Sequence, residues 1–380
     1  MAGFPGSPGR RANPAAPWHH VDTTLMASVV AIASLGMLMV YSATHKKLQD
    51  AGIDSATYLK RQAVFVLLGV GVMILVASID YRVYRDFAPV IYVGGMTLLL
   101  FVLTPLGSTV RGTQAWYQVG PFQLQPSEIA KVVVIVCGST YAALHRGELD
   151  GRRVAVLMAI IGGPMAIVYL QPDLGTALVF VAILMGLLLV AGAKPRHLGI
   201  VVLLGVFGVV TVFQLGVIKQ YQLDRLGAFL DPAHDQKQSA YNLHQSTIAI
   251  GSGGIRGKGL FKGSQTNLSY VPEQRTDFIF TVVGEELGLL GSALLLVLFA
   301  IVVWRTWRAA ALSKDLYGTL VCVGVLAMFV FQIFENVGMT MGIMPITGIP
   351  LPFVSYGGSA TLASFAGIGL VLNVYMRRFS

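Results

Sequence analysis

The sequence has few charged residues and only two cysteines. Charged residues make up 12% of its 380 residues and apolar residues 55%, against about 25% and roughly 45–50% in soluble domains. This composition excludes an ordinary soluble fold. Cys137 and Cys322 lie inside apolar runs, so we interpret them as small packing residues and not as a disulfide framework. Zinc-ligand spacing, a dinucleotide-binding fingerprint and a Walker phosphate loop are also absent, so nucleotide-driven chemistry is not indicated.

Long apolar runs are abundant. A helix needs about 20 mostly apolar residues to cross a bilayer, and ten such runs are present. They predict an all-α, polytopic membrane protein with about ten transmembrane helices, at residues 21–44, 62–78, 87–106, 126–144, 154–170, 174–191, 197–218, 278–304, 317–342 and 356–376. Only Gln171, Pro172 and Asp173 separate the fifth run from the sixth, so one long kinked helix is the alternative there.

The distribution of Lys and Arg predicts the orientation, because cationic loops tend to stay in the cytoplasm. With a cytoplasmic N-terminus, 14 of these residues flank the inner helix ends and five lie in short outer loops. Both termini are therefore expected inside. The net charge of +9 reflects this topology and gives no support for nucleic-acid binding, whereas contact with anionic lipids is compatible with it.

Three segments depart from the pattern of helix and short loop. Residues 1–20 are rich in Gly, Pro, Ala and Arg and predict a disordered cytoplasmic tail before a single ten-helix transmembrane domain at 21–380. Residues 219–276 form a large extracytoplasmic loop, in which a short helix at 246–250 and a glycine-dependent turn at 251–259 are expected. Residues 343–355 contain three prolines and predict a re-entrant-like loop packed near the large one.

Three charged residues lie inside apolar runs. Glu128 and Lys131 are three residues apart and share a helix face, which indicates either a structural ion pair or direct contact with substrate. Glu335 lies in the ninth run, with Lys131 as one candidate partner.

Asp277 stands at the start of the eighth run, at the expected outer interface. A carboxylate there suits a general base. The alternative is a helix N-cap, provided by Thr276 or Asp277. Glu285 lies about 12 Å deeper and Glu286 on the opposite face, so neither forms a glycosidase-like carboxylate pair with Asp277 and we interpret both as structural.

The large loop also carries cations and glycines. The cations are candidates for neutralising a pyrophosphate at the bilayer surface, or else they are solvated loop charges. The turn at 251–254 could add backbone amides to an anion site. The cations are Arg225, Arg256, Lys258, Lys262 and Arg275.

Taken together, several strings resemble the signatures of the shape, elongation, division and sporulation (SEDS) family, in the family's order and over nearly the whole chain. They are QPSE at 125–128 with Lys131, QPDLGT at 171–176, GGIRGKG at 253–259, TDFIF at 276–280 with GEELG at 284–288, and LPFVSYGGS at 351–359. The strings NVGM at 336–339 and GIPLP at 348–352 resemble the branch that serves cell elongation. Glu335 departs from the family's pattern, which usually has a less charged residue there.

The resemblance implies a peptidoglycan glycosyltransferase of the bacterial inner membrane that polymerises lipid II into glycan strands at the outer face, for elongation and rod shape. Transfer would be inverting, with undecaprenyl pyrophosphate as leaving group. Asp277 would be the catalytic base. Independently of the resemblance, the five loop cations, Ser355 and Tyr356 are candidates for substrate binding.

The resemblance also implies partners. These are lipid II, the growing lipid-linked glycan, a class B penicillin-binding protein as transpeptidase, and other membrane proteins of the elongation complex. No metal ligand is assigned, and a divalent cation, Mg²⁺ or Mn²⁺, is a candidate cofactor. Two other functions stay open: a lipid II flippase, which needs a polar cavity open to both faces, and a non-catalytic scaffold, for which Asp277 would be dispensable.

Overall fold

The computed structural model describes residues 20–110, 113–120, 122–147, 149–214, 222, 223, 225, 227, 229, 238–268 and 270–379. The tail predicted for residues 1–20 therefore lies outside the described residues except for His20. Most of the predicted loop segment 219–237 lies outside them as well.

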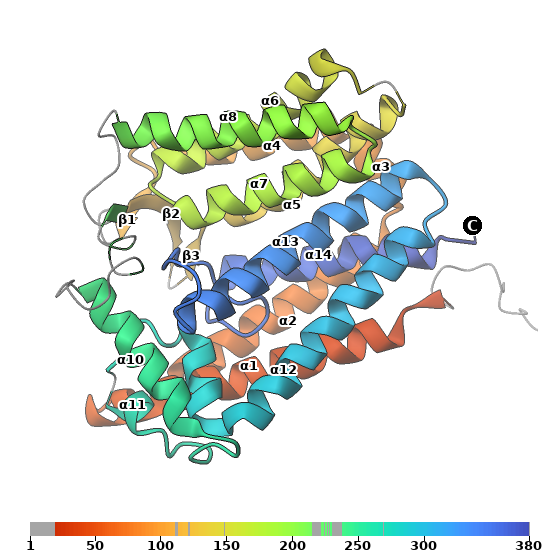
Figure 1. Cartoon of the computed structure of the whole chain (residues 1–380). Helices are drawn as coiled ribbons and strands as arrows, with labels where there is room; N and C mark the ends of the chain where they lie inside the picture. The colour runs from red at the N-terminus through yellow and green to blue at the C-terminus, as the bar shows by residue number, and fades with distance from the viewer. Residues whose placement is uncertain are drawn as a thin grey trace, which may run out of the picture.

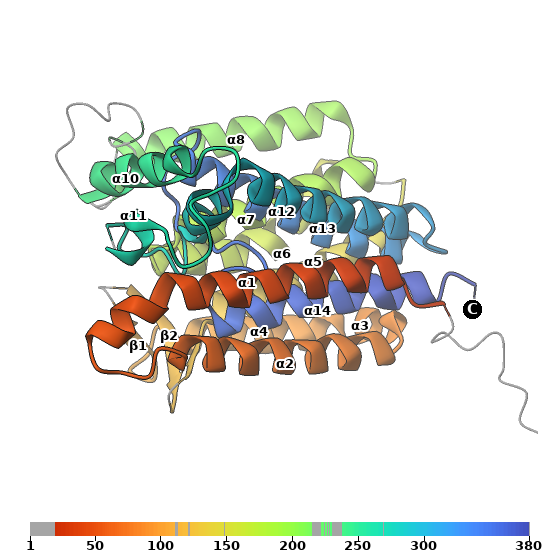
Figure 2. The same cartoon turned by 90° about the horizontal axis from the view of Figure 1, so that it is seen from below.

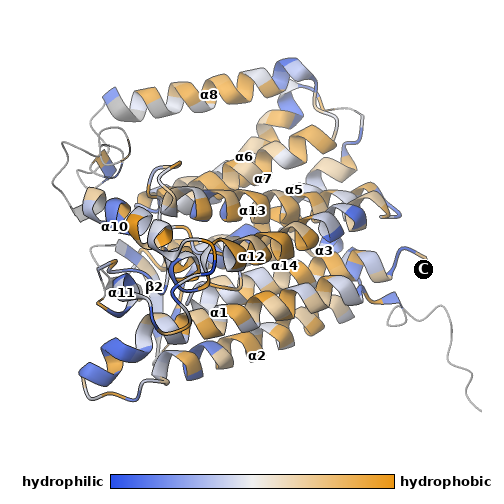
Figure 3. Cartoon of the chain, turned by 60° about the horizontal axis from the view of Figure 1, so that its bottom comes forward, coloured by the Kyte–Doolittle hydropathy of each residue, from blue (hydrophilic) through white to orange (hydrophobic). Residues whose placement is uncertain are grey.

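Among the described residues, ten apolar helices correspond to the ten predicted runs and run side by side (Figures 1 and 2). Seven are long and apolar enough to cross a bilayer, and α4, α7 and α8 are apolar over shorter stretches. Apolar residues dominate the helices (Figure 3). The predicted polytopic, helical membrane fold is confirmed. The ten are α1 (Thr23–Asp50), α2 (Thr57–Ser78), α4 (Ala88–Phe101), α5 (Pro126–Leu144), α6 (Gly151–Leu170), α7 (Leu174–Val190), α8 (Pro195–Gln214), α12 (Ile279–Ala311), α13 (Leu316–Thr340) and α14 (Gly358–Met376).

The fifth and sixth runs form two separate helices. α6 ends at Leu170 and α7 begins at Leu174, and the two pack against each other. Pro172, with φ of 29°, lies in the turn between them, and the side chain of Asp173 caps α7 by accepting from the Thr176 N–H at 3.0 Å. A new N-cap starts a new helix, so the single kinked helix is excluded.

A small antiparallel sheet follows α4 and was not predicted. Its strands, in the order β1-β2-β3, are Ser108–Val110, Thr113–Val119 and Phe122–Leu124. Alternating β-formers in β2 and a left-handed glycine, Gly120 with φ of 58°, account for the hairpin. Phe122 packs edge-on against Phe65 of α2 at 5.3 Å, so the sheet is seated on one end of the bundle.

Two helices form the centre of the bundle. α14 is the most buried of the seven long apolar helices and packs against α2, α5, α12 and α13. α13 packs against α12, α7 and α5. By contrast α8 lies at the edge (Figures 1 and 3), where Leu203 and Phe207 are 68% and 69% exposed.

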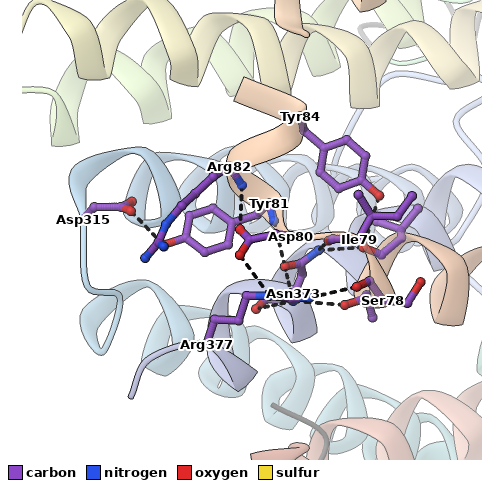
Figure 4. Close-up of polar contacts among 11 residues, drawn as sticks. Ser78, Ile79, Asp80, Tyr81, Arg82, Tyr84, Asp315, Asn373 and Arg377 are labelled. Atoms are coloured by element: carbon purple, nitrogen blue, oxygen red, sulfur yellow. Dashed lines mark hydrogen bonds and ion pairs between the residues drawn. The ribbon is translucent and has the colours of Figure 1, made fainter. Parts of the chain in front are cut away.

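The short helix α3 (Tyr81–Asp86) is joined to α13 and α14 by a polar cluster at the end of the bundle away from the sheet (Figure 4). Tyr81 donates its hydroxyl to Asp315 Oδ2 at 2.7 Å and its N–H to Asn373 Oδ1 at 3.0 Å. The side chains of Asn373 and Arg377 satisfy carbonyls that a helix C-terminus leaves without partners. These belong to Val76, Ala77, Ser78 and Ile79.

In the described part of the large loop, two further helices are present. α10 (Gln238–Gly253) packs on α12 and is longer than the helix expected at 246–250, and α11 (Ser264–Asn267) is a single turn. Positive φ angles at Gly254, Gly257 and Gly259 confirm that the turn after α10 depends on glycine.

Candidate active site

Asp277 lies just before α12 and is partly exposed. The helix begins at Ile279 with Phe278 at its N-cap, and that cap makes no side-chain hydrogen bond. Neither Thr276 nor Asp277 occupies the capping position, so the alternative interpretation of Asp277 as an N-cap is wrong. The chain instead reaches α12 through a series of turns.

Asn336 of α13 and two residues of the loop after α13 bind three consecutive backbone carbonyls around Asp277. The carbonyl of Arg275 accepts from the Tyr356 N–H at 2.9 Å. The carbonyl of Thr276 accepts from Ser355 Oγ at 2.6 Å. The carbonyl of Asp277 accepts from Asn336 Nδ2 at 2.8 Å. The backbone that carries the carboxylate is therefore fixed at every peptide from 275 to 277.

The same two side chains also hold the proline-containing loop. Asn336 Nδ2 donates to the Ile349 carbonyl at 2.8 Å, and Ser355 Oγ accepts from the Leu351 N–H at 2.8 Å. The backbone from 343 to 357 is non-helical, as expected. Phe353 and Val354 are buried, so this loop packs inside the protein, as non-helical backbone in a membrane domain must.

Gly348 lies close to both Asp277 and a loop cation. Its φ is 79°, and a Cβ placed on it would lie 3.2 Å from Asp277 Oδ2 and 3.6 Å from Arg225 Nη1. Arg225 also donates to the Thr347 carbonyl at 3.3 Å. Carboxylate and guanidinium thus flank one glycine, and a larger residue there would be strained and would crowd both.

The other predicted cations have different surroundings. Arg275 stacks on aromatic rings, with its Cζ 4.2 Å from the centre of Tyr58. Arg256 and Lys262 are exposed. Lys258 pairs with the buried Glu285 at 2.8 Å, an internal partner that the sequence does not indicate, and its role toward substrate stays a prediction.

Glu285 and Glu286 attach the large loop to the bundle. Glu285 accepts from the Gln265 and Thr266 N–H groups, each at 2.9 Å, besides Lys258. Glu286 accepts from Ser42 of α1 at 2.6 Å. Both are fully buried, which supports their interpretation as structural residues.

The glycine-rich turn packs directly on a break in α12. Gly288 has φ of 63° inside the helix, and the Leu289 and Leu290 N–H groups donate to the carbonyls of Gly254 and Ile255. Residues up to Gly253 belong to α10, and the Gly254 N–H donates to the carbonyl of Gly251. The predicted anion cradle at 251–254 is therefore wrong, because helical and turn hydrogen bonds use these amides.

The intramembrane ion pair is present in α5. Lys131 Nζ lies 2.7 Å from Glu128 Oε1, and both side chains are almost fully buried. Glu335 is buried in α13, where its carboxyl contacts the Thr347 side chain and Oε1 has no hydrogen-bond partner. The described residues show no Glu335–Lys131 ion pair, so that candidate pairing is wrong.

The described part of the chain contains no preformed metal-binding centre. No three His, Cys, Asp or Glu side chains lie together there. A protein-only site of the kind that holds a structural cation is not formed by these residues. The divalent cation proposed from the sequence stays a prediction.

Comparison with known proteins identifies the family. The model of a cell cycle protein family, FTSW_RODA_SPOVE, matches residues 22–379. The chain belongs to this family. It is 35% identical to stage V sporulation protein E of Bacillus subtilis, over 93% of this chain and 96% of that protein. It is 34% identical to peptidoglycan glycosyltransferase MrdB of Escherichia coli, over 94% of each.

A solved structure of the family agrees with the fold. It concerns the structural coordination of polymerization and crosslinking by a peptidoglycan synthase complex. Its matching chain gives a TM-score of 0.78 at 30% identity, covering 96% of this chain and 100% of that chain. The resemblance to the SEDS family is confirmed. RodA, the member to which MrdB corresponds, is among the relatives that the chain resembles.

Two residues that contact the candidate site were not predicted from the sequence. In the sequence Asn336 stands out only as part of the string at 336–339, although an amide side chain inside an apolar run itself indicates a hydrogen bond to a buried backbone group. Tyr58 gave no signal, because it is an aromatic residue near the start of an apolar run and only the fold brings it to Arg275.

Proposed function

We propose that Asp277 is the general base of this peptidoglycan glycosyltransferase. The observation that carries the proposal is the arrangement of Asn336, Ser355 and Tyr356, which fix three successive carbonyls and leave Asp277 partly exposed beside Gly348. A carboxylate that caps no helix and is held this firmly suits proton transfer, for which geometry is the first requirement.

The reaction is polymerisation of lipid II. Asp277 takes the proton from the 4-hydroxyl of the acceptor N-acetylglucosamine, and that oxygen attacks the anomeric carbon of the donor N-acetylmuramic acid. The bond to undecaprenyl pyrophosphate breaks, and an α-linked donor becomes a β-linkage. Inversion requires a single displacement and one base, consistent with Glu285 and Glu286 being tied into the fold.

The protein must also position the sugars and neutralise the leaving pyrophosphate. Arg225 beside Asp277 and Arg275 two residues before it are the candidates nearest the base. Arg256 and Lys262 are exposed on the same loop. Ser355 and Tyr356 shape the site chiefly through the hydrogen bonds that hold residues 275 and 276.

The cellular role that fits is elongation and rod shape. A class B penicillin-binding protein would supply crosslinking, in line with the coordination of polymerization and crosslinking by the synthase complex that contains the matching chain. The active site would face outward from the bacterial inner membrane with both termini in the cytoplasm, as the Lys and Arg distribution predicts.

The test is polymerisation by the purified chain alone. Supplied with lipid II in detergent, it should produce glycan strands visible on a gel, and adding a transpeptidase partner should change their crosslinking or length but not be needed for their formation. A pure, folded preparation that forms no strand from lipid II under any divalent-cation condition would reject the proposal.

A further inference from the structure

Two arginines share an aromatic support beside the active site. The guanidinium of Arg275 lies 4.2 Å from the ring centre of Tyr58 and 5.8 Å from that of Tyr356. The two rings meet edge to face at 5.1 Å. The guanidinium of Arg61, on α2, interacts with the Tyr356 hydroxyl. All four side chains are partly exposed.

Neither guanidinium is neutralised within the described part of the chain. Among those residues no carboxylate forms an ion pair with Arg61 or Arg275. The neighbouring Lys60, in contrast, pairs with Asp54 at 2.6 Å. Two cations gathered around one tyrosine repel each other, so their arrangement is most favourable when an anion lies between them.

The stacked geometry suits a phosphate ligand. A guanidinium whose face lies on a tyrosine ring keeps its N–H edge free for bidentate contact with phosphate oxygens. The support also orders the long side chain before ligand arrives, which lowers the entropic cost of binding. A diphosphate offers enough oxygens to engage both arginines.

The arginine pair lies close to Asp277, the proposed base. Arg275 is two residues from Asp277, and its carbonyl accepts from the Tyr356 N–H at 2.9 Å. The adjacent Ser355 binds the Thr276 carbonyl. One rigid unit therefore carries both the carboxylate and the stacked arginine.

We propose that Arg61 and Arg275, supported by Tyr58 and Tyr356, form a diphosphate-binding subsite for the lipid-linked sugar donor. The proposal rests on the proposed function for the identity of the donor. The same phosphate chemistry is present in anionic phospholipid headgroups, and the experiment separates the two sources.

The experiment measures binding without turnover. Inorganic pyrophosphate is titrated onto the purified full chain in a neutral detergent at constant ionic strength, and thermal protection is followed. Arg275→Gln should raise the half-saturating concentration at least tenfold, Arg61→Gln several-fold and Tyr58→Leu to a smaller extent. Lys60→Gln removes the same charge from the adjacent residue of α2, and its half-saturating concentration should stay within twofold of wild type.

Arg275→Lys keeps the charge but not the planar fork, and an intermediate loss is expected. If Arg275→Gln does not fold, Arg275→Lys becomes the variant that tests the subsite. Equal pyrophosphate protection in the wild type, both Arg275 variants and Lys60→Gln would overturn the subsite.

Measurements in lipid nanodiscs distinguish the diphosphate of the donor from the phosphate of phospholipid headgroups as the ligand. In phosphatidylcholine discs the protection by pyrophosphate should persist, and adding phosphatidylglycerol should leave the half-saturating concentration within twofold. Loss of the protection on adding phosphatidylglycerol would assign the site to headgroups and overturn the donor assignment.

Asp277→Asn separates this proposal from the proposed function. The variant should keep full pyrophosphate protection while losing polymerisation. If it polymerises normally, the assignment of the base fails while the binding result still decides the subsite.

Discussion

Asp277 is positioned by residues far away in the sequence. Asn336 binds its carbonyl, and Ser355 binds the carbonyl before it. Both side chains are buried, so these hydrogen bonds form where an orphaned carbonyl would cost about 1–3 kcal/mol. The loop from 343 to 357 thereby fixes the direction in which the carboxylate leaves the backbone.

Asp277→Asn tests the base. The amide has nearly the same size but cannot accept a proton near neutral pH, so polymerisation should fall by about 10²–10⁴-fold. Folding and lipid II binding should persist, because Asp277 does not cap α12. The measurement is strand formation at matched protein concentration with thermal unfolding alongside, and normal activity in a folded variant would remove Asp277 from this role.

Asn336→Asp tests the positioning. The substitution keeps the size but replaces the amide donor that now serves two carbonyls, at Asp277 and Ile349. We expect turnover to fall at least tenfold with a smaller change in the KM for lipid II, and the unfolding temperature to drop. A variant that loses stability but keeps its turnover number would show that Asn336 supports the fold without positioning the base.

At the scale of the element, α5 carries an ion pair with almost no solvent access. Glu128→Gln or Lys131→Met leaves the other charge buried without a partner, at a cost of about 3–5 kcal/mol. Each single variant should lose stability or activity, and the double variant should be milder. Thermal unfolding of the three variants checks this, and single variants indistinguishable from wild type would contradict it.

The corner between α2 and α3 gives a pH-dependent prediction. Burial and the hydrogen bond to Asp315 raise the pKa of Tyr81 to about 12, from 10.0 for the free side chain. A raised pKa means that the fold stabilises the protonated hydroxyl, so this contribution is complete below about pH 10 and is lost as the pH rises through about 12.

Tyr81→Phe removes that group. From about pH 9 to pH 12 its unfolding temperature should fall less steeply than that of the wild type, whereas at neutral pH the variant should be the less stable one, because Asp315 loses a donor. Unfolding curves in a pH-stable detergent provide the comparison. Parallel slopes would show that Tyr81 does not contribute to alkaline unfolding.

At the scale of the whole molecule, apolar side chains on α12 and α13 face outward. Leu290 and Val297 are 60% and 55% exposed, and Phe334 is 55% exposed. We expect the single transmembrane helix of a penicillin-binding partner to pack near these two helices.

Photo-crosslinkers at Leu290, Val297 and Phe334 should form adducts with a co-expressed class B penicillin-binding protein. Leu67 and Leu75 of α2, 71% and 59% exposed, serve as controls on another lipid-facing helix. Adducts only at the α2 positions would place the partner elsewhere.

The sequence by itself predicted the apolar helices, apart from whether the fifth and sixth runs are separate, because a bilayer requires about 20 apolar residues per span and this requirement is local. The Glu128–Lys131 pair was predictable for the same reason, since three residues on a helix bring the side chains together. Asp277 was found through its string and its place at the start of an apolar run.

Only the tertiary structure decided which residues hold Asp277 and which cations lie near it. Asn336 and Ser355 reach residues 277 and 276 across 59 and 79 positions of chain, and no periodicity encodes such a separation. The same holds for Tyr58 under Arg275 and for Lys258, which a buried carboxylate engages. Helix formation depends on near neighbours along the chain, whereas the surroundings of a side chain depend on how the helices pack.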